Sequence, residues 1–228
     1  MAVAFKSSYF SAGASSGTTI TLTPSTTAGS LIVLIVACKA TSLTVSGIAD
    51  NASGGSNVYT SCGANSVDTS NYRTEVWYAA NAKATTSIVV TMSGTITDGN
   101  VAMLEYTGAA TSTPFDVATT GAGASGTTWN TGSFTPTASG ETVVCFAIDA
   151  AGVGNQSPAT NYTQRDNGNG SGAKLCGEDY IGAPAGSQTA GWTSDTSTTW
   201  QVVAAVFSTV NITIPTPGIS ILQFGIGV

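Results

Sequence analysis

Residues 31–38, Leu-Ile-Val-Leu-Ile-Val-Ala-Cys, form the longest unbroken apolar run in the chain. The run is too short to cross a bilayer as a helix, which takes about 20 residues, and its β-branched content suits a strand buried on both faces. A second run at 142–148, Thr-Val-Val-Cys-Phe-Ala-Ile, has the same character, and a turn with Pro and Gly precedes each run. Two such strands predict an all-β protein built from two related halves.

Short apolar or alternating stretches, separated by Gly, Ser, Asn and Pro, predict the other strands, because a period of two marks a half-buried strand. In the first half we expect strands at 3–9, 18–23, 31–38, 43–46, 58–60, 73–79, 87–92 and 101–106. In the second half we expect them at 115–118, 129–135, 142–148, 162–165, 173–181, 188–192 and 201–207. The Gly-rich tract at 120–126 is expected to be flexible.

These two series predict an antiparallel β-sandwich that is jelly-roll-like, with pseudo-repeated halves at about 18–107 and 127–207 inside a body at 1–208. Two arrangements fit this pattern. The halves could form two sandwiches side by side, or one larger sandwich in which each half contributes strands to both sheets. We favour the single sandwich, because no Pro-rich or charge-rich linker separates the halves.

Charge is scarce in this chain. Only 8% of the residues are charged, whereas soluble domains usually have about 25%. The six basic residues are scattered singly, so there is no basic stripe for nucleic-acid phosphates and no polybasic patch for anionic lipid. Residues 1–10 lack the basic segment and apolar core of a secretion signal. We therefore expect no nucleic-acid or membrane partner, and assembly in a cytoplasm.

The four cysteines predict structure rather than chemistry. No Cys-x-x-Cys unit is present and the chain has no histidine, so a zinc site of the usual kind is not expected. Cys38 and Cys145 lie inside the two apolar runs, where a free thiol acts as a small hydrophobic side chain. We expect buried free thiols. The alternative is one or two disulfides, with Cys62 and Cys176 as the pair that fits best.

The acidic residues offer little for catalysis. Without histidine, Ser-His-Asp and Cys-His sites are excluded. Glu178 and Asp179 are adjacent, so on a strand their side chains point to opposite faces and do not form a carboxylate pair. Glu75 and Glu105 are expected at exposed strand positions. The loops at 50–51 and 166–169 carry calcium-type oxygen ligands, but they match no defined calcium loop and fit turns better. We predict no catalytic residue, no metal and no cofactor.

Most of the aromatic residues are expected in the core, since aromatic residues on strands usually pack inward. Trp129, which follows the Gly-rich tract, is the one that we expect to face outward. An outward indole would suit stacking on a sugar ring, so Trp129 is the candidate glycan-binding residue.

The segment 209–228 differs from the body. Pro215, Pro217 and Gly218 separate its end from the preceding strands. Beyond them apolar residues nearly alternate, and we expect this arm to add to a neighbouring subunit or to another protein, because such a surface is costly in water. The alternative is a last strand that packs on its own body. The candidate partner-binding residues are Ile219, Ile221, Leu222, Phe224, Ile226 and Val228.

One family resemblance emerges from these residues. The segments that carry it are 28–33 (Ala-Gly-Ser-Leu-Ile-Val), 45–51 (Val-Ser-Gly-Ile-Ala-Asp-Asn), 76–81 (Val-Trp-Tyr-Ala-Ala-Asn), 88–94 (Ile-Val-Val-Thr-Met-Ser-Gly) and 101–108 (Val-Ala-Met-Leu-Glu-Tyr-Thr-Gly). This pattern resembles β-sandwich modules that recur in bacteriophage virion proteins and in some bacterial surface proteins. The resemblance covers roughly residues 18–208 and brings no catalytic residues with it.

The resemblance implies a non-enzymatic structural protein of a phage virion, such as a capsid decoration, fibre or tail-surface protein. Such a protein would be located in the virion after assembly in the host cytoplasm. Its partners would be further copies of itself, as a homo-oligomer, and other virion structural proteins. The alternative is a carbohydrate-binding module or adhesin that binds a host surface glycan. An enzyme such as a depolymerase is a third hypothesis, and it would need a carboxylate pair in a cleft.

Overall fold

The computed structural model describes residues 2–11, 13–67, 72–152, 154–169 and 174–209. This part of the chain consists of strands joined by turns and loops, and the prediction of an all-β, antiparallel sandwich is confirmed. In chain order the strands are β1 (Ala4–Phe10), β2 (Thr19–Leu22), β3 (Ser30–Lys39), β4 (Val45–Asp50), β5 (Thr60–Val67), β6 (Tyr72–Ala82), β7 (Ile88–Met92), β8 (Gly99–Thr107), β9 (Phe115–Asn130), β10 (Glu141–Asp149), β11 (Gln156–Pro158), β12 (Thr163–Asn169), β13 (Lys174–Ala183) and β14 (Gly191–Phe207).

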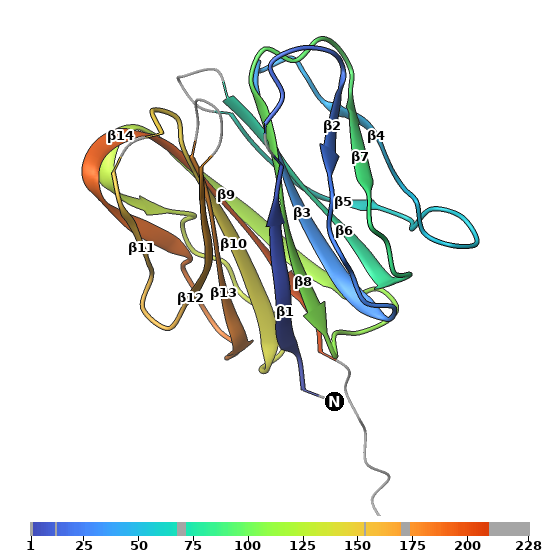
Figure 1. Ribbon diagram of the computed structural model, residues 1–228. Coiled ribbons are helices and arrows are strands. Elements are labelled where there is room, and N and C mark those ends of the chain that lie inside the picture. Colours follow the sequence, from blue (N-terminus) through green and yellow to red (C-terminus); the bar gives the residue numbers. More distant parts are fainter. Residues whose placement is uncertain (1, 12, 68–71, 153, 170–173, 210–228) are drawn as a thin grey trace, which may run out of the picture.

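The two halves have the same strand order. The first half forms a sheet in the order β1-β8-β3-β6-β5, and the second forms a sheet in which β14, β10, β13 and β12 follow one another and β9 pairs with β14 (Figure 1). Strand β9 therefore corresponds to β1, β14 to β8, β10 to β3, β13 to β6 and β12 to β5. The same order of strands therefore occurs twice, over 4–107 and over 115–207.

Each of these large sheets belongs to one half of the chain. The favoured arrangement, in which each half contributes strands to both sheets, is therefore wrong. Instead, the two sheets pack face to face, and the sandwich forms between the halves rather than by exchange of strands. This result explains the missing linker, because the short connection from β8 to β9 joins two layers that are in direct contact.

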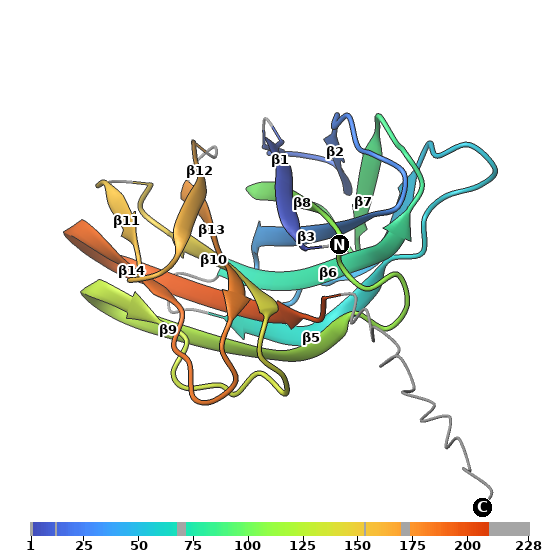
Figure 2. The ribbon, with the colours of Figure 1, turned by 90° about the horizontal axis from the view of Figure 1, so that it is seen from below.

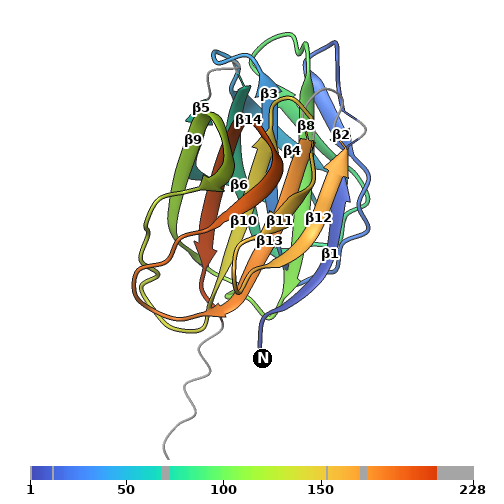
Figure 3. The same ribbon diagram turned by 90° about the vertical axis from the view of Figure 1, so that its left-hand side faces the viewer.

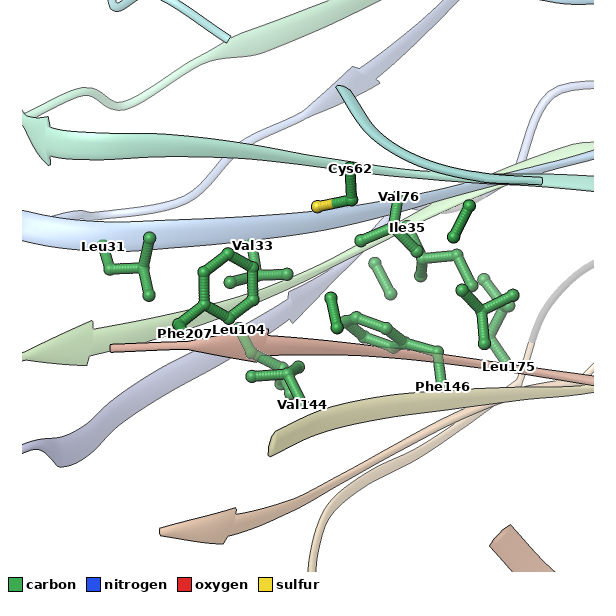
Figure 4. Packing of buried hydrophobic residues seen from close by; sticks show 14 of the residues in the cluster. Leu31, Val33, Ile35, Cys62, Val76, Leu104, Val144, Phe146, Leu175 and Phe207 are labelled. Carbon is green, nitrogen blue, oxygen red and sulfur yellow. The ribbon is translucent and has the colours of Figure 1, made fainter. Parts of the chain in front are cut away.

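The central core lies between the two sheets. From β3 it receives Leu31, Val33 and Ile35, and from β10 it receives Val144 and Phe146, all of them at most 1% exposed. Figure 4 shows these side chains pointing toward one another across the gap between the ribbons. Burial of a large apolar side chain is worth about 1.5–3 kcal/mol, so this shared cluster is a major source of stability for both halves.

The opposite faces of β3 and β10 are apolar as well, and each has its own cover. A three-stranded sheet, β2-β7-β4, packs on the first. The second is covered by β11, by the start of β14 and by the end of β9, which form a smaller layer of the same kind. The fold thus has four layers, with the two large sheets inside. The alternate residues that face these outer layers are Ile32, Leu34 and Val36 in β3 and Val143, Cys145 and Ala147 in β10.

Contacts across the centre follow a pseudo-two-fold axis. Strand β1 contacts β12 while β5 contacts β9, and β8 contacts β13 while β6 contacts β14. Strands β3 and β10, which correspond to each other, meet at the centre. Figure 2 shows β5 beside β9 at one edge, and Figure 3 looks onto the second sheet with β12 near β1 at the other edge. The two halves are arranged like the subunits of an isologous dimer.

The Gly-rich tract is part of β9 and not a flexible loop, so that prediction is wrong. Strand β9 curls so strongly that a Cβ atom at Gly121 would lie 1.9 Å from the carbonyl oxygen of Asn130. A Cβ at Gly123 would lie 2.6 Å from Nε1 of Trp200 on β14. Glycine is needed at both positions because there is no space for a side chain, and the tract allows one strand to serve two layers.

Replacement of Phe146 by alanine should lower the free energy of unfolding by about 3–5 kcal/mol, because it leaves a cavity between the two sheets. Urea denaturation measures the change. Phe146→Leu, which keeps most of the volume, is the matched control and should cost less than about 1.5 kcal/mol. A loss below about 1 kcal/mol for Phe146→Ala would show that the central cluster is not closely packed.

Candidate functional site

Two glutamates of the first half fix loops to the large sheet. Glu105 on β8 is fully buried, and its carboxylate accepts hydrogen bonds from the backbone N–H of Thr27 (2.6 Å) and the hydroxyl of Ser7 (2.7 Å). Glu75 on β6 accepts a hydrogen bond from the backbone N–H of Val45 (3.2 Å). The prediction that Glu75 and Glu105 are exposed is wrong, since they are 6% and 0% exposed. Bonds to backbone N–H groups compensate for their burial, and Glu75 also forms an ion pair with Arg73 at 2.9 Å.

Glu178 on β13 has a comparable place in the second half. Its two carboxylate oxygens accept hydrogen bonds from the backbone N–H groups of Ala159 (3.1 Å) and Gly191 (3.2 Å). Burial raises the pKa of Glu178 to about 8, and the two backbone N–H groups only partly oppose this effect. The side chain is therefore largely protonated at neutral pH, and it lies in the outer core beside the Cys145 thiol.

Asp179 points to the other face of the same strand, as the sequence predicts. Its carboxylate forms an ion pair with Arg165 of β12 at 2.8 Å, and the Arg165 guanidinium lies 4.4 Å from the ring centroid of Phe5. Burial and the Asp179 carboxylate raise the pKa of Tyr106 in the central cluster well above its ordinary value. The side chains of Glu178 and Asp179 thus lie on opposite faces of β13 and cannot act together on one substrate.

Trp129 does not face outward, so that prediction is wrong. Its side chain is 1% exposed and packs in the outer core of the second half with Trp192. The curl of β9 fixes it there, since its Nε1–H donates to the carbonyl oxygen of Gly126 at 3.0 Å. An indole in this position cannot stack on a sugar ring from solvent.

A groove of about 460 Å³ lies on the outer side of the same layer. Trp129 and Trp192 are among the residues that line it, but they are only 1% and 2% exposed. The polar side chains of this outer groove are threonines and one asparagine, groups that can hydrogen-bond to a sugar or to a peptide backbone. They are Thr128, Asn130, Thr160, Thr189 and Thr193.

Of the two segments with calcium-type ligands, the one at 50–51 leads from β4 into a turn, whereas 166–169 belongs to β12, so the turn prediction is wrong for 166–169. The carboxylate of Asp50 accepts hydrogen bonds from the backbone N–H groups of Ala52 and Asn57, both at 3.1 Å, and from the Tyr59 hydroxyl at 2.8 Å. Asp166 accepts a hydrogen bond from Ser8 across the two sheets. Within the described ranges, no group of three or more His, Cys, Asp or Glu side chains is placed to hold a metal ion.

All four cysteines are free and buried, which confirms the prediction of free thiols over disulfides. Burial raises the pKa of Cys38 to about 11 and the pKa of both Cys62 and Cys176 to about 12. Burial also raises the pKa of Cys145 well above its ordinary value. Because the thiolate is the reactive form, these side chains are inert in the folded protein.

The six candidate partner-binding residues between 219 and 228 lie outside the described residues. Among the residues that the structure does describe, no helix is long and apolar enough to cross a membrane. Comparison with known proteins finds no family model, no curated protein and no solved structure that matches the chain.

The raised pKa of Glu178 predicts a specific pH dependence of stability. Between pH 4.5 and about 8 the folded state holds a proton that the unfolded state has lost, so the free energy of unfolding should fall as pH rises through this window. The slope from this one group approaches about 1.4 kcal/mol per pH unit. Glu178→Gln should remove this contribution, as urea denaturation at a series of pH values would measure.

The control for this experiment is Asp195→Asn, because the Asp195 carboxylate is exposed and the N–H groups of Asn155 lower its pKa. This control should not gain stability relative to the wild type as pH rises. A stability difference between Glu178→Gln and the wild type that stays constant from pH 4.5 to pH 8 would contradict a raised pKa for Glu178.

The four thiols should be unreactive toward a disulfide reagent such as Ellman's reagent at pH 8 in the native protein, because they are buried and protonated. In denaturant without reductant all four should react. A native thiol that reacts within minutes would contradict the burial, and fewer than four thiols in denaturant would reveal a disulfide.

Proposed function

We propose that this protein is a non-enzymatic structural component of a phage virion. In this proposal the β body is displayed on the particle, and the arm at 209–228 joins each subunit to its neighbours. One contrast carries the proposal. The body buries its apolar side chains in three clusters, whereas the arm carries an uncharged apolar pattern whose exposure would be costly in water.

The burial and hydrogen bonding of the acidic residues support a structural role. Glu75, Glu105 and Glu178 are each buried and bonded to backbone N–H groups, so none of the three lies in an open cleft as a catalytic carboxylate would. Their role is to fix loops to sheets. A rigid β body with a surface of hydroxyl groups and few charges suits a protein whose work is to hold its place in an assembly.

The outer groove favours a second candidate, a carbohydrate-binding module or adhesin, because its threonines and Asn130 could hydrogen-bond to a glycan. The burial of Trp129 and Trp192 weakens this candidate, since no indole is left to stack on a sugar ring there. Glycan-array binding that is lost in Asn130→Ala would support it over the structural role.

Assembly of the purified protein tests the structural proposal. Serine at positions 219, 221, 224 and 226 should make the protein monomeric in light scattering, because the arm loses most of its apolar surface. The melting temperature of the body should stay within a few degrees. The matched control changes the interleaved polar residues, Ser220→Thr and Gln223→Asn, and should assemble like the wild type.

Assembly of the serine variant at wild-type strength would contradict the role of the arm. Mass spectrometry of purified particles tests the virion itself: the protein should be present in a fixed ratio to the other structural proteins. Its absence from washed particles would contradict the proposed location.

A further inference from the structure

A second groove lies where the two halves join, and we call it the junction groove. It is lined by Val58 and Thr60 at the start of β5, by Tyr78 and Ala80 on β6, and by the segment 111–114, and its volume is about 310 Å³. None of these lining residues is charged. An apolar segment could therefore enter without taking a charge out of water.

The junction groove has an unusual apolar rim. Among the described residues, Val58 is the large hydrophobic residue that is exposed to solvent, with an exposed fraction of 82%. Tyr78 forms a fixed wall, because its ring stacks on Phe115 at 5.9 Å and meets Phe207 edge-on at 5.5 Å. The opposite wall contains Thr113 at a φ of 43°, a strained backbone position for a β-branched residue that persists only where the surroundings hold it.

The described part of the chain ends at Thr209, beside the wall formed by 111–114. The backbone N–H of Ser208 donates to the carbonyl oxygen of Pro114 at 2.7 Å, and the N–H of Ala110 donates to Ser208 at 3.1 Å. Thr209 then forms a bridge with Ala109. The arm therefore begins beside the junction groove, and its position relative to the groove of its own subunit is fixed at this point.

We propose that the junction groove receives the segment 219–228 of a second copy of this chain, an inference that rests on the proposed role of the arm. The nine residues at 210–218 include Pro215 and Pro217, and a Pro-containing linker favours an extended form that spans roughly 30 Å. A spacer of this reach brings the groove of a neighbouring copy within range of residue 219.

The groove is not repeated at the corresponding edge of the second half. Thr60 of β5 pairs with Tyr78, and Thr163 of β12 pairs with Asp179, which occupies the position of Tyr78 in the second sheet. Val58 and Asn161 each lie two residues before these threonines, so they correspond to each other. The opposite edge thus has an amide where the junction groove has an apolar side chain. With one arm and one acceptor groove in each subunit, the contact can close as a reciprocal exchange between two copies or continue head to tail into a ring or filament.

Two full-length variants test the inference. Val58→Asp places a charge in the junction groove but leaves the arm intact, while the double variant Ile221→Asp with Phe224→Asp disables the arm but leaves the groove intact. Each alone should be monomeric, with self-association weakened about 100-fold or more. Mixed in equal amounts, they should form a complex of two chains and no larger species, because one intact arm meets one intact groove. Native mass spectrometry and light scattering measure both results.

Asn161→Asp is the matched control, since it adds the same charge at the corresponding position of the other half and should assemble like the wild type. Val58 is largely exposed, so Val58→Asp should keep the wild-type melting temperature. If it does not fold, Ser112→Arg, an exposed position on the opposite wall, replaces it.

The possible failures are distinguishable. Wild-type assembly by Val58→Asp would overturn the junction groove as acceptor and leave the role of the arm standing. Wild-type assembly by the arm variant, or a monomeric wild type, would overturn the proposed function and this inference with it. A mixture that stays monomeric would show that the arm binds elsewhere or in its own subunit, and it would overturn the exchange between copies.

Discussion

Two strands that are apolar on both faces determine this architecture. Strands β3 and β10 place alternate residues into different clusters, and hardly any of their surface reaches solvent. A sheet built around such a strand must be covered twice. In each half one cover is a small layer from the same half, and the other is the large sheet of the other half. The contact between the two large sheets therefore gives each half the second cover that it lacks by itself.

The pseudo-two-fold arrangement also shows where the halves have diverged. Tyr78 and Asp179 occupy corresponding positions, because they pair with Val33 and Val144 of the central strands. At one edge Tyr78 belongs to an aromatic cluster, and at the other edge Asp179 holds Arg165. The backbone is arranged in the same way at the two edges, but the side chains there differ in chemical character. A surface feature at one edge, such as the junction groove, consequently need not have a copy at the other.

Much of the fold could be predicted from the sequence, because β3 and β10 are unbroken apolar runs of strand length and strands such as β2 and β7 alternate with a period of two. The curl of β9 could not be predicted, since a Gly-rich tract reads as a flexible loop unless the close approach of Trp200 is known. The predicted strand at 58–60 shares only Thr60 with β5, because the residues after Thr60 are small and give little hydrophobic signal, although Cys62 and Ala64 alternate into the core. For the site, the burial of Glu105 and Trp129 depends on loops and strands that are distant in sequence. No local pattern marks Val58, whose proposed role depends on where the described chain ends.

Native-state hydrogen exchange tests the central claim, which is that the two halves share one core and are stable only together. The account predicts that the amides of Leu34 in β3 and Cys145 in β10 exchange only through global unfolding, with free energies that agree within about 1 kcal/mol of each other and of the value from denaturation. If one of these strands exchanged through an opening several kcal/mol lower than the other, the halves would be independent units, and the account would be contradicted.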